Sequence, residues 1–138
     1  MAHEKYVLTL NKEQAQIVSR ACELYCRLHM GQLEEINHEL LMAETRDMIC
    51  ERRSQAMCLL SQLKKLFFPS LHGVGHSYGL GKCKDADTAW NVHHAIRYKM
   101  AWHEHPEGGF GVQFDPPLSW LDAELPECVI QKEERTEP

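Results

Sequence analysis

The residues best suited to chemistry begin in a glycine-rich segment. Residues 72–82 contain four glycines, which let a backbone approach a ligand closely and present its N–H groups. Polar and aromatic side chains lie between them. We expect the following residues to contact an anionic ligand: His76, Ser77, Tyr78, Gly79 and Lys82. The alternative is a glycine-rich crossover loop that packs on a helix.

This segment does not match the established phosphate-binding patterns. A P-loop carries serine or threonine after its lysine, but Cys83 follows Lys82 here, and His76 occupies the position of the first glycine. In the dinucleotide-binding pattern, Tyr78 occupies the position of the third glycine. Kinases and nucleotide-dependent dehydrogenases are therefore disfavoured.

A second group of polar side chains lies in residues 90–102. At helical spacing they form two neighbouring rows: Asn91, His94 and Tyr98 in one, His93 and Arg97 in the other. A guanidinium matches phosphate or carboxylate, and an aromatic ring can stack on a base. We expect His94, Arg97 and Trp102 to bind the ligand. The alternative is a polar rim that closes over the core.

Arg27 and Gln32 flank the Met30-Gly31 junction between two expected helices. A helix–glycine–helix corner with polar side chains can line a pocket, so both residues join the expected ligand-binding set. The alternative is a solvated corner.

The six cysteines and nine histidines do not form a recognised metal or catalytic motif. The sequence has no C-x-x-C pair, no H-E-x-x-H, no deaminase signature and no G-x-S-x-G. We therefore expect no metal, no cofactor and no catalytic residue. A metal-dependent nucleotide hydrolase and a Cys/His pair both remain open alternatives.

Charge is unevenly distributed along the chain, whose net charge is −5. Residues 46–99 carry nine basic and four acidic side chains, whereas residues 100–138 carry two basic and nine acidic ones. An acidic chain is a poor candidate for duplex DNA binding, but a small anion needs only a few cations in one pocket. We expect no duplex DNA partner.

Hydrophobic periodicity predicts the elements that must position these residues. Apolar side chains recur at helical spacing over residues 12–30, 32–42, 45–68 and 85–103, which predicts four helices. Asn11 and Gln14 predict a capping box at the start of the first. Residues 6–10 and 110–114 alternate in hydrophobicity, which predicts two strands.

These elements predict an α+β fold. Two lone strands near opposite ends of the chain would pair as an antiparallel ribbon against a mostly helical body. Residues 1–121 would form a single compact domain, and residues 122–138 an acidic, loose tail. The composition is that of a soluble globular protein, and with neither a signal peptide nor a membrane span we expect a cytoplasmic one.

Several short motifs resemble a family of small, largely uncharacterised bacteriophage proteins, over residues 6–117. In the first half they are Leu8-Thr9-Leu10, Glu23-Leu24-Tyr25 and Met30-Gly31-Gln32; in the second, Ser77-Tyr78-Gly79, Ile96-Arg97-Tyr98 and Pro106-Glu107-Gly108-Gly109. The resemblance supplies no catalytic residues. It implies a phage protein that acts against host defence.

We therefore expect a non-enzymatic protein that sequesters a nucleotide immune signal, of the cyclic oligonucleotide or cyclic ADP-ribose type, in the infected bacterial cell. Arg97, Lys82 and the backbone around Gly79 would hold phosphates, and Tyr78 or Trp102 would stack a base. His94 and Gln32 would form hydrogen bonds with the polar edges of the ligand. The pocket could lie between the subunits of a homo-oligomer. The alternatives are a protein-binding inhibitor of a host defence or nucleic-acid enzyme that uses an acidic surface, and the metal-dependent hydrolase.

Overall fold

The described part of the chain is helical. The computed structural model describes residues 3–41, 46–71, 75–118 and 121–133. These contain four α-helices and one 3₁₀ helix: α1 Lys12–His29, α2 Glu35–Leu41, α3 Arg46–Phe67, α4 Lys84–Glu104 and η1 Val112–Phe114. The four helices lie where hydrophobic periodicity predicts them, although α2 begins three residues later than expected.

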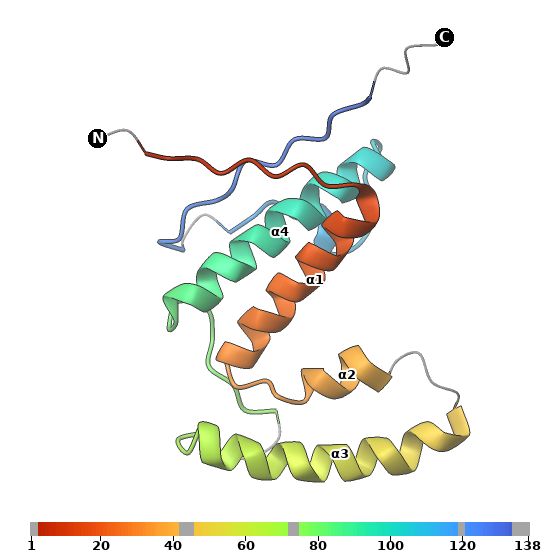
Figure 1. Cartoon of the computed structure of the whole chain (residues 1–138), viewed down its shortest axis with the longest axis vertical. Helices are drawn as coiled ribbons and strands as arrows, with labels where there is room; N and C mark the ends of the chain where they lie inside the picture. Colours follow the sequence, from red (N-terminus) through yellow and green to blue (C-terminus); the bar gives the residue numbers. More distant parts are fainter. Residues whose placement is uncertain (1–2, 42–45, 72–74, 119–120, 134–138) are drawn as a thin grey trace.

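Helices α1 and α4 form the main packing unit. They lie side by side and run in opposite directions (Figure 1). Lys12 at the start of α1 forms an ion pair with Glu104 at the end of α4. Helix α3 lies across the far end of this pair, with the short α2 between them (Figure 1).

The predicted capping box begins α1. The Asn11 side chain accepts a hydrogen bond from the backbone N–H of Gln14 at 2.9 Å, and the Gln14 side chain accepts one from the Asn11 N–H at 3.0 Å. These two bonds satisfy backbone donors that the first turn of a helix leaves free. The capping prediction is confirmed.

The predicted α+β class is wrong, because the described residues contain no β-strand. Residues 6–10 have no ladder partner, and Tyr6 and Val7 are more than nine-tenths exposed. Residues 112–114 form η1 instead of a strand. Trp102 donates a hydrogen bond from Nε1 to the Phe114 carbonyl at 3.2 Å, and their rings pack at 5.5 Å. These contacts hold the segment against the end of α4, so the ribbon cannot form.

The hydrophobic core between α1 and α4 is small. It centres on Cys26, Met30 and Ala86, with half-buried side chains such as Tyr78 and Trp90 packed around it. Burial raises the pKa of the Cys26 thiol to about 11, so this thiol is protonated and packs as a small apolar group. Ser19 and His93 add buried polar side chains to the same interface.

The segment after η1 returns to α4. Leu121 is buried, and Asn91, which is fully buried, donates a hydrogen bond from Nδ2 to the Ala123 carbonyl at 2.7 Å. From Glu124 to Glu133 the chain runs past the α1–α4 pair on the side away from α3 (Figure 1). Residues 134–138 of the expected tail lie outside the described residues.

Candidate functional site

The C-terminus of α1 forms a Schellman motif that turns the chain back on itself. The Gly31 N–H donates to the Leu28 carbonyl at 3.0 Å, and the Gln32 N–H donates to the Arg27 carbonyl at 2.9 Å. Gly31 has φ +86°, a conformation that favours glycine. The motif brings Gln32 back beside Arg27.

The glycine-rich segment docks on this corner. The Tyr78 N–H donates to the Met30 carbonyl at 2.8 Å, and the Gln32 amide donates to Ser77 Oγ at 3.2 Å. The Tyr78 ring packs edge-on against Phe68, which follows α3. The loop therefore packs on helical structure, which was the alternative interpretation from sequence, and it also brings Ser77 to the predicted polar corner.

Arg27 is held by several acceptors at this corner. Its Nε donates to Glu23 Oε1 at 3.1 Å, and its Nη1 donates to Gln32 Oε1 at 2.8 Å. Glu35 of α2 lies 3.7 Å from the same guanidinium. Two carboxylates thus balance the charge of Arg27, which leaves it little capacity to attract a further anion.

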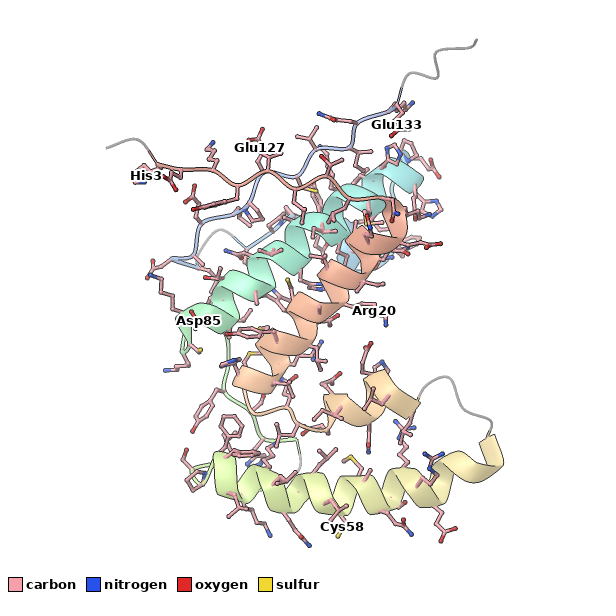
Figure 2. The ribbon with its side chains drawn as sticks, in the orientation of Figure 1. His3, Arg20, Cys58, Asp85, Glu127 and Glu133 are labelled. Atoms are coloured by element: carbon pink, nitrogen blue, oxygen red, sulfur yellow. The ribbon has the colours of Figure 1, made fainter. Side chains whose placement is uncertain are left out.

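A pocket of about 260 Å³ opens between α1 and α2. Its lining is Arg20, Glu23, Leu24, Arg27, Glu35, His38 and Glu39. Arg20 points from α1 toward α2 (Figure 2), where its guanidinium meets Glu39 at 2.7 Å. With neutral histidine, the three carboxylates exceed the two guanidinium groups by one charge. The pocket itself is therefore weakly acidic.

Glu23 connects this pocket to the interface between α1 and α4. Glu23 Oε2 lies 3.8 Å from Nε2 of His93, which is buried. His93 Nδ1 lies 2.9 Å from Ser19 Oγ and 3.0 Å from the Ser19 carbonyl. Because a carbonyl only accepts, we assign the proton to Nδ1, so that Nε2 carries a lone pair.

Ser19, His93 and Glu23 have the residue types of a catalytic triad, but their arrangement is structural. Both Ser19 and His93 are buried, and the Ser19 hydroxyl lies 3.3 Å from the His93 carbonyl, to which it can donate. The histidine faces the serine through its protonated nitrogen, which cannot take the hydroxyl proton. Burial lowers the pKa of His93 and outweighs the opposing effect of Glu23, so the ring is neutral at neutral pH.

Arg97 lies beside His93 and Trp90 on α4. Its guanidinium carbon lies 5.9 Å from the centre of the Trp90 ring, which is a cation–π contact. Arg97 Nε and Trp90 Nε1 are both buried, and neither has a hydrogen-bond partner among the described residues. Burial lowers the pKa of Arg97, while the charges of Glu23 and Asp115 raise it. Arg97 is therefore a half-buried cation with no hydrogen-bonded anion in the described protein.

Of the predicted ligand-binding residues, the structure joins Arg27, Gln32 and Ser77 in one hydrogen-bonded chain. Tyr78 adjoins them through its backbone bond to Met30. The other loop residues, His76, Gly79 and Lys82, are exposed. A Cβ at Gly79 would meet nothing within 4 Å, so no described neighbour closes around it.

Two predicted residues on α4 serve the segment that follows it. His94 Nε2 lies 3.1 Å from the Asp115 carbonyl, and burial lowers the pKa of this histidine. Trp102 donates a hydrogen bond to the Phe114 carbonyl, and its ring lies 3.0 Å from where a Cβ added at Gly108 would stand. Both side chains therefore hold residues 108–115 against α4.

Sequence reasoning did not select Glu23 or Trp90. Trp90 and Arg97 lie seven residues apart, two helical turns, and this spacing was a signal for their contact. Glu23 and Arg27 lie four apart, the spacing of a helical ion pair. The meeting of Glu23 with His93 had no sequence signal, because it depends on how α1 packs against α4.

Among the residues that the structure describes, no group of three or more histidine, cysteine, aspartate or glutamate side chains is placed to hold a metal ion. Within the same residues, no helix has both the length and the apolar character that a membrane crossing requires. Comparison with known protein families, with curated proteins and with solved structures finds no match to this chain.

Proposed function

We propose that this chain is a phage counter-defence protein that binds a nucleotide immune signal and sequesters it without cleavage. The signal would be a cyclic oligonucleotide or a cyclic ADP-ribose type molecule, bound in the cytoplasm of the infected bacterial cell. The observation that carries the proposal is the half-buried Arg97 guanidinium, which has no hydrogen-bonded anion among the described residues.

The physical argument rests on the cost of burying a cation. A buried charge without a partner is unfavourable, and an oxyanion at Arg97 would recover that cost through charge-assisted hydrogen bonds. Arg20 and Arg27 already face carboxylates, so Arg97 is the stronger phosphate ligand. Glu23 and Arg27, whose charges reach Arg97, both line the pocket between α1 and α2.

The size of that pocket bears on how the ligand would be enclosed. Sites for small ligands usually measure about 300–1,000 Å³. The pocket here is about 260 Å³ and Arg97 lies outside its lining, so one chain would enclose only part of a cyclic dinucleotide. We therefore include a homo-oligomer in the proposal, with a second copy that completes the ligand's enclosure.

A binding screen tests the proposal. The protein is incubated with cyclic dinucleotides, cyclic trinucleotides and ADP-ribose cyclic isomers, washed, denatured, and its released ligand identified by mass spectrometry. We expect one intact nucleotide in near-stoichiometric amount. Recovery of an altered nucleotide would favour the hydrolase alternative.

Variants of α4 locate the binding group. Arg97→Ala should abolish binding, and Arg97→Lys should weaken it, because lysine lacks the planar fork. Lys99→Ala is the matched control, since it removes an exposed cation from the same helix. Equal binding by Arg97→Ala and Lys99→Ala would rule out Arg97 as the phosphate ligand.

One observation favours the protein-binding inhibitor as a second candidate. Asp122, Glu124, Glu127 and Glu133 are all exposed, and they lie on an extended part of the chain. Such a segment could present acidic side chains to a basic enzyme surface. If no nucleotide is recovered in the screen, pull-down from infected cells with wild-type chain and a chain truncated after Ala123 would test this candidate.

A further inference from the structure

The chain exposes far more surface than a compact protein of its mass. Its accessible surface is 11078 Å². A compact protein of 16.0 kDa exposes about 7,400 Å², so the excess is about 3,700 Å². Extended terminal segments supply part of it. The described core also lacks buried phenylalanine, isoleucine and valine, which leaves apolar side chains of the helices uncovered.

Helix α3 accounts for much of this uncovered apolar surface. One of its faces meets α2: Lys64 is buried and lies 3.5 Å from Glu34, and the Arg53 carbonyl accepts a hydrogen bond from Asn37 at 3.2 Å. A second face is polar, and there Cys58 points away from α2 (Figure 2). The third face is apolar, and its leucines are exposed: Leu59 by 62%, Leu63 by 41% and Leu66 by 77%.

The spacing of this third face is that of a helix-pairing seam. Ala56, Leu59, Leu63 and Leu66 follow one another at intervals of three, four and three residues, the pattern of a and d positions in a heptad. Such a seam buries its leucines against another helix. Among the described residues, α2 is the helix in extensive contact with α3, and it packs on the neighbouring face.

We propose that the seam of α3 (Ala56, Leu59, Leu63 and Leu66) pairs with the seam of a second copy of this chain, antiparallel and across a two-fold axis. A stable dimer buries about 800 Å² of each chain, and the excess exposed surface of the whole chain, to which α3 contributes, exceeds that area. A two-fold pairing also closes on itself, so the same seam is covered in both copies.

Side-chain size selects the antiparallel direction. Heptad layers then place Leu59 against Leu63 of the second copy, and Ala56 against its Leu66. A parallel pair would instead place the small Ala56 side chain against its equivalent and leave a gap between the helices. This seam does not include Arg97, so a monomeric mass and a loss of nucleotide binding in Arg97→Ala are distinguishable outcomes.

The mass of the protein in solution is the first test. Sedimentation velocity or light scattering at micromolar concentration should give twice the 16.0 kDa of one chain. A single-chain mass at every concentration would overturn the proposal. A monomer that binds lipid vesicles through α3 would overturn it as well, because a lipid surface and not a second chain would then cover the leucines.

Substitutions in the seam form the second test. Leu63→Glu should give a monomer with unchanged helix content by circular dichroism, because it places a charge in the seam. Gln62→Glu adds the same charge beside the seam and should remain a dimer. A folded Leu63→Glu chain that stays dimeric would overturn the assignment of the seam.

Mixing two variants tests the register and does not depend on either being a dimer alone. Leu59→Lys and Leu63→Glu should each be monomeric and should form a mixed dimer, because the new lysine and glutamate then face each other. Failure of two folded variants to associate, while the wild-type chain is a dimer, would overturn the antiparallel register.

Discussion

Glu23 Oε2 on α1 lies 3.8 Å from His93 Nε2 on α4, in the interface between these two helices. The other oxygen of Glu23 bonds Arg27, and the other nitrogen of His93 faces Ser19. One carboxylate thus links the corner at the end of α1 with the polar part of the interface.

The burial of His93 beside Glu23 predicts a pH-dependent stability. Burial holds the pKa of His93 below its ordinary value of 6.5, with Glu23 opposing the shift and Arg97 and His94 adding to it. Below about pH 6.5 the unfolded chain therefore binds a proton that the folded chain resists, and stability falls as pH falls. We expect a lower urea midpoint at pH 5.5 than at pH 7.5.

The same comparison in His93→Gln isolates this histidine. The variant should lose part of the pH dependence, with His94 retaining some, because burial lowers the pKa of that ring too. His103→Gln is the control at an exposed position of the same helix. An unchanged pH profile in His93→Gln would contradict the prediction.

Glu23→Gln tests the charge of the ligand. The substitution removes a negative charge near Arg97 and from the pocket lining, so an anionic ligand should bind more tightly. We expect a gain of about 1 kcal/mol, roughly fivefold in Kd. Calorimetry with the recovered nucleotide measures it. Glu39 faces Arg20, so Glu39→Gln is the matched control and should have a smaller effect. Weaker binding by Glu23→Gln would contradict an anionic ligand near Arg97.

Gly31→Ala should destabilise the fold. The positive φ of Gly31 is strained for alanine, and the new Cβ would overlap the Leu71 side chain. We expect a loss of about 2 kcal/mol in the free energy of unfolding. Gly79→Ala is the control, since it meets nothing within 4 Å. Chemical denaturation measures both, and equal stability of the two variants would contradict the role given to the Schellman corner.

Asn91→Ala should release the chain after η1. It removes the hydrogen bond to the Ala123 carbonyl and leaves a cavity at a fully buried position. We expect a loss of about 2 kcal/mol and faster proteolysis near Ala123. Limited proteolysis with mass spectrometry measures the cleavage, and His103→Gln, at an exposed position of the same helix, should behave as wild type. Unchanged cleavage would show that Leu121 alone anchors the segment.

Local signals predicted the helices and several of their ends. The capping box at Asn11 and the helix-ending Gly31 depend on residues within a few positions of each other, so a sequence contains all that they require. Arg27 and Gln32 were predicted as a polar corner for the same reason, and the Schellman motif brings them together.

The predicted strands failed where distant residues compete with strand pairing. Alternation in residues 110–114 is compatible with a strand, but Trp102 offers those residues both a hydrogen bond and a ring contact. His94 faces the Asp115 carbonyl, and its expected role in ligand binding stays a prediction. Neither partner is visible from local periodicity.

The sequence by itself determined which segments are helical and where α1 begins and ends, because these follow from spacing and backbone conformation along one stretch of chain. Only the tertiary structure decided that Glu23 faces His93, that Arg97 is half-buried without a hydrogen-bonded anion among the described residues, and that residues 112–114 join α4. The packing of α1 against α4 brings Ser19 to His93, 74 positions away, and Glu23 to the same histidine, and local sequence carries no signal for such contacts.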